Sequence, residues 1–230
     1  ILAGVRKLPP ATYRVVEPDG SSRDTTYWQP RHERRPEHAG WSPRDWEDAI
    51  EEALRVAVRR RLVADIPVGV LLSGGLDSSL IVGLLAQEGQ TGLATYSIGF
   101  ETVGGRVGDE FRYSDVIAER FATDHHRIRV GADELAAALG HAIGAMSEPM
   151  VSHDVVAFDL LSERVSQTIR VVQSGQGADE VFAGYHWYPP LAGVDREQAV
   201  ETYARAFFDR DDAGVRAVVA DRYRVDGDPS

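Results

Sequence analysis

The sequence predicts an α/β fold in which a parallel β-sheet is flanked by helices, and three observations support this. From about residue 43 onward, short apolar runs alternate with segments of helical periodicity, an order typical of strand–helix–strand units. The apolar runs are almost unbroken, as in parallel strands that are buried on both faces. The chain has 230 residues, of which 43% are hydrophobic, and this is enough for a sizeable core. We therefore expect parallel strands joined by right-handed crossovers.

The amino-terminal segment, residues 1–40, predicts a short hairpin followed by a linker. It is rich in proline, arginine and turn-forming residues, and Asp19-Gly20 is a favourable turn pair between two short runs. We interpret this segment as a boundary region, separate from the α/β unit that begins near residue 41.

A long helix is predicted from Pro43 to Leu62. Ser42 is a good N-cap residue, proline suits the first helical position, and the acidic start and arginine-rich end match the helix dipole. Apolar residues recur at four-residue steps along this segment, which predicts that one side of the helix faces inward. These residues are Trp46, Ile50, Leu54 and Val58.

The rest of the chain alternates between strands and helices. Unbroken apolar character predicts strands at residues 66–72, 93–100, 126–130 and 169–173. Periodicity predicts helices at residues 78–87, 111–121, 135–146, 155–167, 196–208 and 212–220. In open parallel sheets, ligands bind beyond the carboxyl ends of the strands, so the loops that follow these strands are the first candidates for a site.

Composition excludes several classes of function. The chain has 25 basic and 36 acidic residues, a net charge of -11, which disfavours extended contact with nucleic-acid phosphates. No apolar run approaches the roughly 18 residues of a membrane span, and no signal peptide is recognisable. There is no cysteine for a disulfide, a thiolate nucleophile or a zinc site. We expect a cytoplasmic protein, and because no methionine starts the sequence, a piece of a longer polypeptide.

The segment Val70–Ser79, VLLSGGLDSS, carries the strongest local signal for a ligand. Gly74 and Gly75 allow backbone conformations that other residues avoid, so successive amides can line one concavity at the start of the next helix. Ser73 and Ser78 add hydroxyl donors. A carboxylate beside an anion is unfavourable unless it holds a cation, so Asp77 predicts Mg²⁺ bridging to phosphates. The alternative is an ordinary strand-to-helix turn capped by Ser and Asp.

The string SGGLDSS resembles the signature of the PP-loop ATP pyrophosphatases, enzymes that transfer AMP to a substrate and release pyrophosphate. It matches neither the lysine-containing P-loop nor the spaced glycines of dinucleotide-binding loops. The resemblance implies a parallel-sheet domain of the adenine nucleotide alpha hydrolase type, with ATP and Mg²⁺ bound at this loop.

A second motif selects a family within that group. Residues 172–185, VQSGQGADEVFAGY, resemble the SGEG-x-DE-[LV]-F-x-GY segment of glutamine-dependent asparagine synthetases, again after an apolar strand. The resemblance extends to PVGVLLSGGLDSSL, SIGF, EFRYSDVIAERF, HHRIRV and SEPM, and covers nearly all of residues 43–190. It implies that residues 1–40 are the tail and exit linker of a glutaminase domain, and residues 41–230 the amino-terminal part of a synthetase domain.

The resemblance also implies roles for individual residues. Those expected to hold pyrophosphate are Ser73, Gly74, Gly75, Asp77 and Ser78. Those expected to frame the adenosine are Leu71, Ile98, Ser174 and Gly175. Asp77 and Asp179 are the expected Mg²⁺ ligands. Leu71 and Ile98 are also compatible with ordinary core positions, and Asp179 with a helix N-cap.

Gln176 is the main departure from the family. The synthetases carry a glutamate here, whereas an amide cannot accept a proton at neutral pH. Gln176 is still expected at the catalytic centre, as a hydrogen-bond donor to an oxyanion or to the substrate carboxylate. Glu180 or a residue beyond position 230 is the alternative base. Aspartate is therefore a less obvious substrate than it is for the synthetases.

The combination SGQGADEVFAGYHWYP with EPMVSHD resembles a narrower group, the N-acetylglutaminylglutamine amidotransferases, which amidate a capped dipeptide. This predicts a substrate carboxylate larger than aspartate, with His153 and His186 as candidates for the substrate side. A lone histidine is, however, more often an ordinary surface or core residue. We interpret His125-His126, at the start of a strand, as structural.

The resulting prediction is an ATP-dependent ligase that amidates a carboxylate through an acyl-adenylate, with ammonia from glutamine supplied by a glutaminase domain of the same polypeptide. The alternatives are asparagine synthesis, an RNA-modifying PP-loop enzyme, which the acidic charge disfavours, and a nucleotide-binding module without catalysis. We expect no nucleic-acid or membrane partner, and this piece alone is expected to be inactive. A homo-oligomer is compatible with the sequence, which does not determine the oligomeric state.

Overall fold

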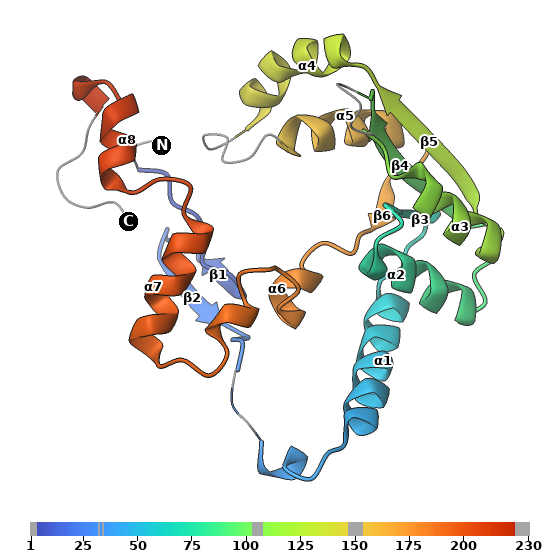
Figure 1. Cartoon of the computed structure of the whole chain (residues 1–230), viewed down its shortest axis with the longest axis horizontal. Helices are drawn as coiled ribbons and strands as arrows, with labels where there is room; N and C mark the ends of the chain where they lie inside the picture. The colour runs from blue at the N-terminus through green and yellow to red at the C-terminus, as the bar shows by residue number, and fades with distance from the viewer. Residues whose placement is uncertain (1–3, 32, 34, 103–107, 147–153, 224–230) are drawn as a thin grey trace.

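The computed structural model describes residues 4–31, 33, 35–102, 108–146 and 154–223. Its central feature is a parallel four-stranded sheet in the order β5-β4-β3-β6 (Figure 1). The strands are β3 (Val68–Leu71), β4 (Ala94–Phe100), β5 (Asp124–Val130) and β6 (Val171–Gln173). The predicted α/β class and all four predicted strands are thereby confirmed, with ends that differ by two residues or fewer.

The direction in which successive strands are added to the sheet reverses beside β3. From β3 the chain moves to β4 and then to β5 on one side, whereas β6 pairs with β3 on the other side. The carboxyl ends of β3 and β6 are therefore neighbours, although about a hundred residues separate them in the sequence. Open parallel sheets bind ligands at such a reversal, because the loops diverge there and leave a crevice.

Helices pack against both faces of the sheet. The helices that follow β3, β4 and β5 are α2 (Leu76–Gln87), α3 (Phe111–Phe121) and α4 (Ala132–Ala145), and α5 (Asp154–Ser166) precedes β6. One core cluster joins β3 to α2 and to the long helix α1 (Pro43–Arg60), with Val70 and Leu72 almost fully buried. Another cluster joins β4 to α5 through Tyr96 and Leu161.

Helix α1 begins as predicted, but its apolar side is only partly buried. Ser42 accepts from the Asp45 amide, and the Asp45 carboxylate accepts from the Ser42 amide, a reciprocal capping box. The sequence predicts that the apolar side of this helix faces inward at Trp46, Ile50, Leu54 and Val58. This prediction is wrong for the amino-terminal half of the helix, because Trp46 and Ile50 are 44% and 38% exposed. The carboxyl-terminal half of α1 packs against α2, whereas the amino-terminal half extends away from the sheet (Figure 1).

The remaining elements lie outside the sheet. The predicted hairpin is confirmed: β1 (Thr12–Val16) pairs with β2 (Ser22–Thr26) in antiparallel fashion around Asp19-Gly20. The carboxyl-terminal part forms α7 (Arg196–Phe207) and α8 (Asp212–Val218). Four short elements were not predicted, and they are η1 (Pro36–His38), α6 (Ala178–Phe182), η2 (Pro189–Leu191) and η3 (Asp221–Tyr223). Short turns of this kind are too brief to show a period in the sequence.

Candidate functional site

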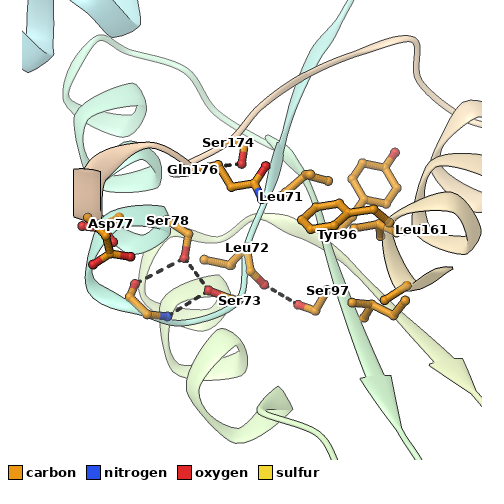
Figure 2. Close-up of a pocket in the computed structure, with 16 residues that line it drawn as sticks. Leu71, Leu72, Ser73, Asp77, Ser78, Tyr96, Ser97, Leu161, Ser174 and Gln176 are labelled. Atoms are coloured by element: carbon orange, nitrogen blue, oxygen red, sulfur yellow. Dashed lines mark hydrogen bonds between the residues drawn. The ribbon is translucent and has the colours of Figure 1, made fainter. Parts of the chain in front are cut away.

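A pocket of about 310 Å³ lies at the predicted place, where the strand order reverses beside β3. The end of β3, the start of α2, the loop after β6 and α6 supply one part of its lining, and β4 and α5 supply the rest. Figure 2 shows a polar end around Asp77 and Ser78 and an apolar end around Tyr96 and Leu161. This polarity suits an amphipathic ligand that has a flat apolar part and a charged tail.

The glycine loop at the polar end depends on Gly74. Its φ of +87° lies in the left-handed region, which only glycine adopts without strain. A methyl group on Gly74 would also lie 2.5 Å from the Cβ of Tyr113 and from the amide nitrogen of Ser114, both on α3. Gly75, by contrast, has a φ of −68°, so the expectation that both glycines need special backbone conformations is wrong for Gly75.

Several backbone N–H groups at this loop are available to an anion. Gly75 is the N-cap of α2 and has no side chain to cap the helix, so the amides of Leu76, Asp77 and Ser78 have no hydrogen-bond partner among the described residues. Unpaired amides at a helix N-terminus attract negative charge. The Gly75 amide is different, since it donates to the Ser73 hydroxyl over 3.2 Å.

The serine hydroxyls predicted to contact phosphate hold the loop together in this structure. The Ser78 hydroxyl donates to the Gly75 carbonyl oxygen over 3.2 Å and lies 3.1 Å from the Ser73 hydroxyl (Figure 2). The Ser79 hydroxyl donates to the same carbonyl oxygen over 2.6 Å. A phosphate would therefore compete with these internal bonds for the hydroxyl protons, and the free amides are the readier donors.

The loop after β6 packs directly on the glycine loop. A methyl group on Gly175 would lie 2.9 Å from the Cβ of Asp77 and 3.0 Å from the Ser78 amide nitrogen, so the two loops touch with no space for a side chain. The backbone N–H group of Gln176 donates to the Ser174 hydroxyl over 3.2 Å. Gly177, with a φ of +95°, is the N-cap of α6. The N-cap role considered for Asp179 is therefore wrong, because Asp179 lies two residues inside that helix.

This packing brings most of the predicted site residues together. Residues that line the pocket include Leu71, Ser73, Gly75, Asp77, Ser78, Ile98, Ser174, Gly175, Gln176 and Asp179. Gly74 does not line it, since it faces α3 and supports the loop from behind. Asp77, near the start of α2, and Asp179, in α6, both line the pocket, and Gly184 packs against the Asp179 carboxylate.

Two carboxylates are a suitable set for Mg²⁺ that arrives with a phosphate chain. Among the residues that the structure describes, no group of three or more His, Cys, Asp or Glu is placed to hold a metal. Mg²⁺ commonly uses one or two carboxylates together with phosphate oxygens and water, so Asp77 and Asp179, which both line the pocket, are the residues that would hold it.

The apolar end of the pocket contains residues that were not predicted. Leu71 and Ile98 line it as expected, and they are joined by Tyr96, Phe158 and Leu161. Tyr96 could have been identified, because it lies two residues before Ile98 on the same strand and therefore on the same face. Phe158 and Leu161 had no such signal, since only the packing of α5 against β4 places them there.

Other candidates are not part of this lining. Glu180 is exposed, and its carboxylate accepts a hydrogen bond of 2.8 Å from the Tyr185 hydroxyl. This bond raises the pKa of Tyr185 to about 12. The exposed ring of His186 packs edge-on against Trp187, with ring centroids 4.9 Å apart. The segments SEPM and EPMVSHD, with His153, span residues 147–154, and of these only Asp154 belongs to the described residues.

Comparisons with known proteins agree with the family that the two motifs indicate. The chain is 29% identical to asparagine synthetase [glutamine-hydrolyzing] 1 of Bacillus subtilis over 81% of its length, but it covers only 28% of that relative. It is 28% identical to amidase chyE of Penicillium rubens, over 88% of this chain and 34% of that one. The chain thus spans about a third of the length of these relatives or less.

A looser likeness exists among solved structures. The NH3-dependent NAD synthetase of Campylobacter jejuni superimposes with a TM-score of 0.41 at 15% identity, over 70% of this chain and 73% of that chain. In the part of the chain that the structure describes, no helix is long and apolar enough to cross a membrane.

The family model for asparagine synthase matches residues 49–226, which is most of the chain. The chain therefore belongs to the asparagine synthase family.

Proposed function

We propose that this chain is the ATP-binding part of a ligase that converts a carboxylate into an amide through an acyl-adenylate. The observation that carries the proposal is the pocket of about 310 Å³, in which unpaired helix amides and the Asp77 carboxylate lie at one end and apolar side chains at the other, and which Asp179 also lines. The triphosphate would occupy the end with Asp77 and Asp179, and the adenosine would lie against Leu71 and Ile98. Family membership supports the same chemistry.

The reaction would proceed in two steps. A substrate carboxylate oxygen attacks the α-phosphorus of ATP, the bond to the bridging oxygen breaks, and pyrophosphate leaves. Ammonia then attacks the acyl carbon, loses a proton, and displaces AMP. The free amides of residues 76–78 would stabilise the charge on the departing pyrophosphate, and bound Mg²⁺ would offset more of that charge. Holding both reactants in one pocket supplies the orientation that the first step needs.

Gln176 is best assigned to orienting the substrate. It lines the pocket beside Asp77 and Asp179, and an amide in this place adds hydrogen-bonding capacity without adding a third negative charge. The base that takes the proton from ammonia would then be another group. Glu180 remains a candidate only if its bond to Tyr185 is exchanged for a contact with the pocket.

The substrate is proposed to be a capped dipeptide of the N-acetylglutaminylglutamine type, with aspartate as the second candidate. The motif around Gln176 favours the first, and the relationship to asparagine synthetases supports the second. Ammonia is proposed to come from glutamine through a glutaminase domain of the same polypeptide. Residues 1–40 would be the end of that domain and residues 41–230 the start of the synthetase domain.

Substrate-dependent release of pyrophosphate tests this proposal. The polypeptide that contains this chain is incubated with ATP, Mg²⁺, glutamine and a panel of carboxylates that includes aspartate and capped dipeptides. We expect pyrophosphate and AMP to appear in equal amounts with one carboxylate and only at background levels without it. ATP that binds but is not cleaved with any carboxylate would contradict the proposal and support a binding module without catalysis.

Replacing Gln176 with glutamate tests its role. We expect Gln176→Glu to slow pyrophosphate release with a capped dipeptide by about tenfold or more, because a carboxylate cannot donate the hydrogen bonds by which the neutral amide would orient the substrate carboxylate. The control is Gln167→Glu, which introduces the same charge at an exposed residue just after α5. An increase in rate with aspartate as substrate would instead assign Gln176 as the residue that excludes aspartate.

A further inference from the structure

The imidazole of His125 is surrounded by the hydroxyl groups of three residues near the glycine loop. The side chain of this β5 residue is only 7% exposed. Its Nδ1 atom is 2.8 Å from the Thr95 hydroxyl, and its Nε2 atom is 3.0 Å from the Ser97 hydroxyl and 3.1 Å from the Ser114 hydroxyl. The ring therefore joins β4, β5 and α3, the elements that lie behind the loop.

Counting protons determines which ring nitrogen carries hydrogen. The Ser97 hydroxyl donates its only proton to the Leu72 carbonyl oxygen over 2.6 Å, and the Ser114 hydroxyl donates to the Phe111 carbonyl oxygen over 3.1 Å. Both hydroxyls can then only accept from His125, so Nε2 must be the donor. In the neutral ring Nδ1 accepts from the Thr95 hydroxyl, which in turn accepts from Thr123 over 2.9 Å.

The neutral ring is also the form that its surroundings favour. Burial lowers the pKa of His125, an effect that the carboxylate of Asp115 on α3 partly opposes. Arg127 and His126, both on β5, lower this pKa further. With its Nε2 proton and its Nδ1 lone pair both used, the neutral imidazole leaves no polar ring atom without a partner.

Both hydroxyls that accept from His125 lead directly to the glycine loop. Ser97 holds the carbonyl group of Leu72, the residue immediately before Ser73 (Figure 2). Ser114 belongs to the stretch of α3 against which Gly74 packs, where a methyl group on Gly74 would lie 2.5 Å from the Ser114 amide nitrogen. The Nε2–H group of His125 thus binds both the Ser97 hydroxyl, which contacts the residue before the loop, and the Ser114 hydroxyl, on the helix against which the loop packs.

We propose that His125 is a positioning residue for the glycine loop: its Nε2–H group fixes Ser97 and Ser114, and through them the backbone of residues 72–74. His125 touches no ligand and takes no part in proton transfer. Without this donor, two buried hydroxyls lose a partner, and the loop can shift by rotation of Ser97 away from Leu72. The inference rests on the proposed function only in naming ATP as the ligand of the loop.

The test compares three variants that remove different parts of this group. His125→Phe keeps a planar ring but has no donor, and His125→Gln keeps an N–H donor that can reach both serines. Thr123→Ala is the matched control, because it removes a hydroxyl of the same network on the side away from the loop. Unfolding in urea first establishes that each variant is folded.

Amide hydrogen exchange reads the loop directly, without any ligand. The reporters are the Leu72 amide, bonded to the Tyr96 carbonyl oxygen, and the Ser79 amide, bonded to the Gly75 carbonyl oxygen. The Gln90 amide, bonded to the Leu85 carbonyl oxygen beyond the far end of α2, is the internal reference. Relative to Gln90, we expect exchange at Leu72 and Ser79 to be about tenfold faster in His125→Phe. It should be close to wild type in His125→Gln and Thr123→Ala.

Binding of ATP with Mg²⁺ is then measured by calorimetry on the same chains. We expect His125→Phe to weaken binding about tenfold and His125→Gln to restore most of it. If wild-type chain does not bind ATP but exchange changes as expected, the positioning role stands and the proposed function of this chain fails. If wild-type chain binds ATP and His125→Phe changes neither exchange at the loop nor affinity, the positioning role is overturned.

A measurement on the unmodified chain keeps the inference testable if His125→Phe does not fold. Nitrogen-15 chemical shifts of the His125 ring distinguish the two neutral tautomers. We expect the proton on Nε2, and a ring with its proton on Nδ1 contradicts the proposal, because Ser97 and Ser114 would then have no donor. In addition, Ser97→Ala should reproduce the faster exchange at Leu72, since it removes the same contact to the loop.

Discussion

Gly74→Ala is expected to abolish detectable nucleotide binding and to destabilise the fold, whereas Gly75→Ala is expected to leave stability nearly unchanged. At Gly74 the left-handed backbone alone costs about 1–2 kcal/mol for alanine. The new methyl group would also lie 2.5 Å from the Cβ of Tyr113, so that α3 or the loop must move. Together these effects predict a loss of roughly 2–5 kcal/mol in the free energy of unfolding.

The adjacent glycine is the control for this prediction. Gly75 has a φ of −68°, and among the described residues a methyl group there would approach only the Ser73 hydroxyl, at 3.4 Å. We therefore expect Gly75→Ala to change the unfolding free energy by less than about 1 kcal/mol. Urea denaturation of both variants checks this difference. Equal stabilities for the two variants would mean that Gly74 does not have a left-handed backbone conformation.

Asp77→Asn is expected to reduce Mg²⁺-dependent cleavage of ATP by roughly a hundredfold or more, with little effect on folding. The substitution keeps the shape of the side chain but removes the charge that attracts the cation. Asp77 occupies the second position of α2, where a carboxylate contributes only about 0.3–1 kcal/mol through the helix dipole. Pyrophosphate release measured over a range of Mg²⁺ concentrations, together with urea denaturation, separates the two effects.

Asp133→Asn is the matched control, because Asp133 occupies the second position of α4, a helix whose N-cap is likewise a glycine. The two variants should lose similar stability, and only Asp77→Asn should lose activity. Asp179→Asn should lose Mg²⁺-dependent activity as Asp77→Asn does. If the two carboxylates hold one ion, the double variant should lose less activity than the two single losses in activation free energy added together. Full turnover of Asp77→Asn at unchanged Mg²⁺ dependence would remove Asp77 from the metal site.

Much of this molecule was predictable from local sequence. The strands and helices around the sheet follow from apolar runs, periodicity and the cap at Ser42, because these signals act within a few residues of each other. The loops at Ser73–Ser78 and Ser174–Asp179 were recognisable because each follows a buried strand and has an unusual composition. Their meeting at one pocket followed from the rule that parallel strands present their carboxyl ends at the same edge of a sheet.

The sequence by itself therefore determined the order of the elements, the two loops and the family. Tertiary structure decided which glycine is strained, that Tyr96, Phe158 and Leu161 complete the pocket, that Glu180 pairs with Tyr185, and that half of the apolar side of α1 is exposed. It also placed the His125 ring within hydrogen-bond distance of Ser97 and Ser114. The reason is physical: such contacts join residues far apart in the chain, and their partners depend on how whole elements pack, which no local pattern records.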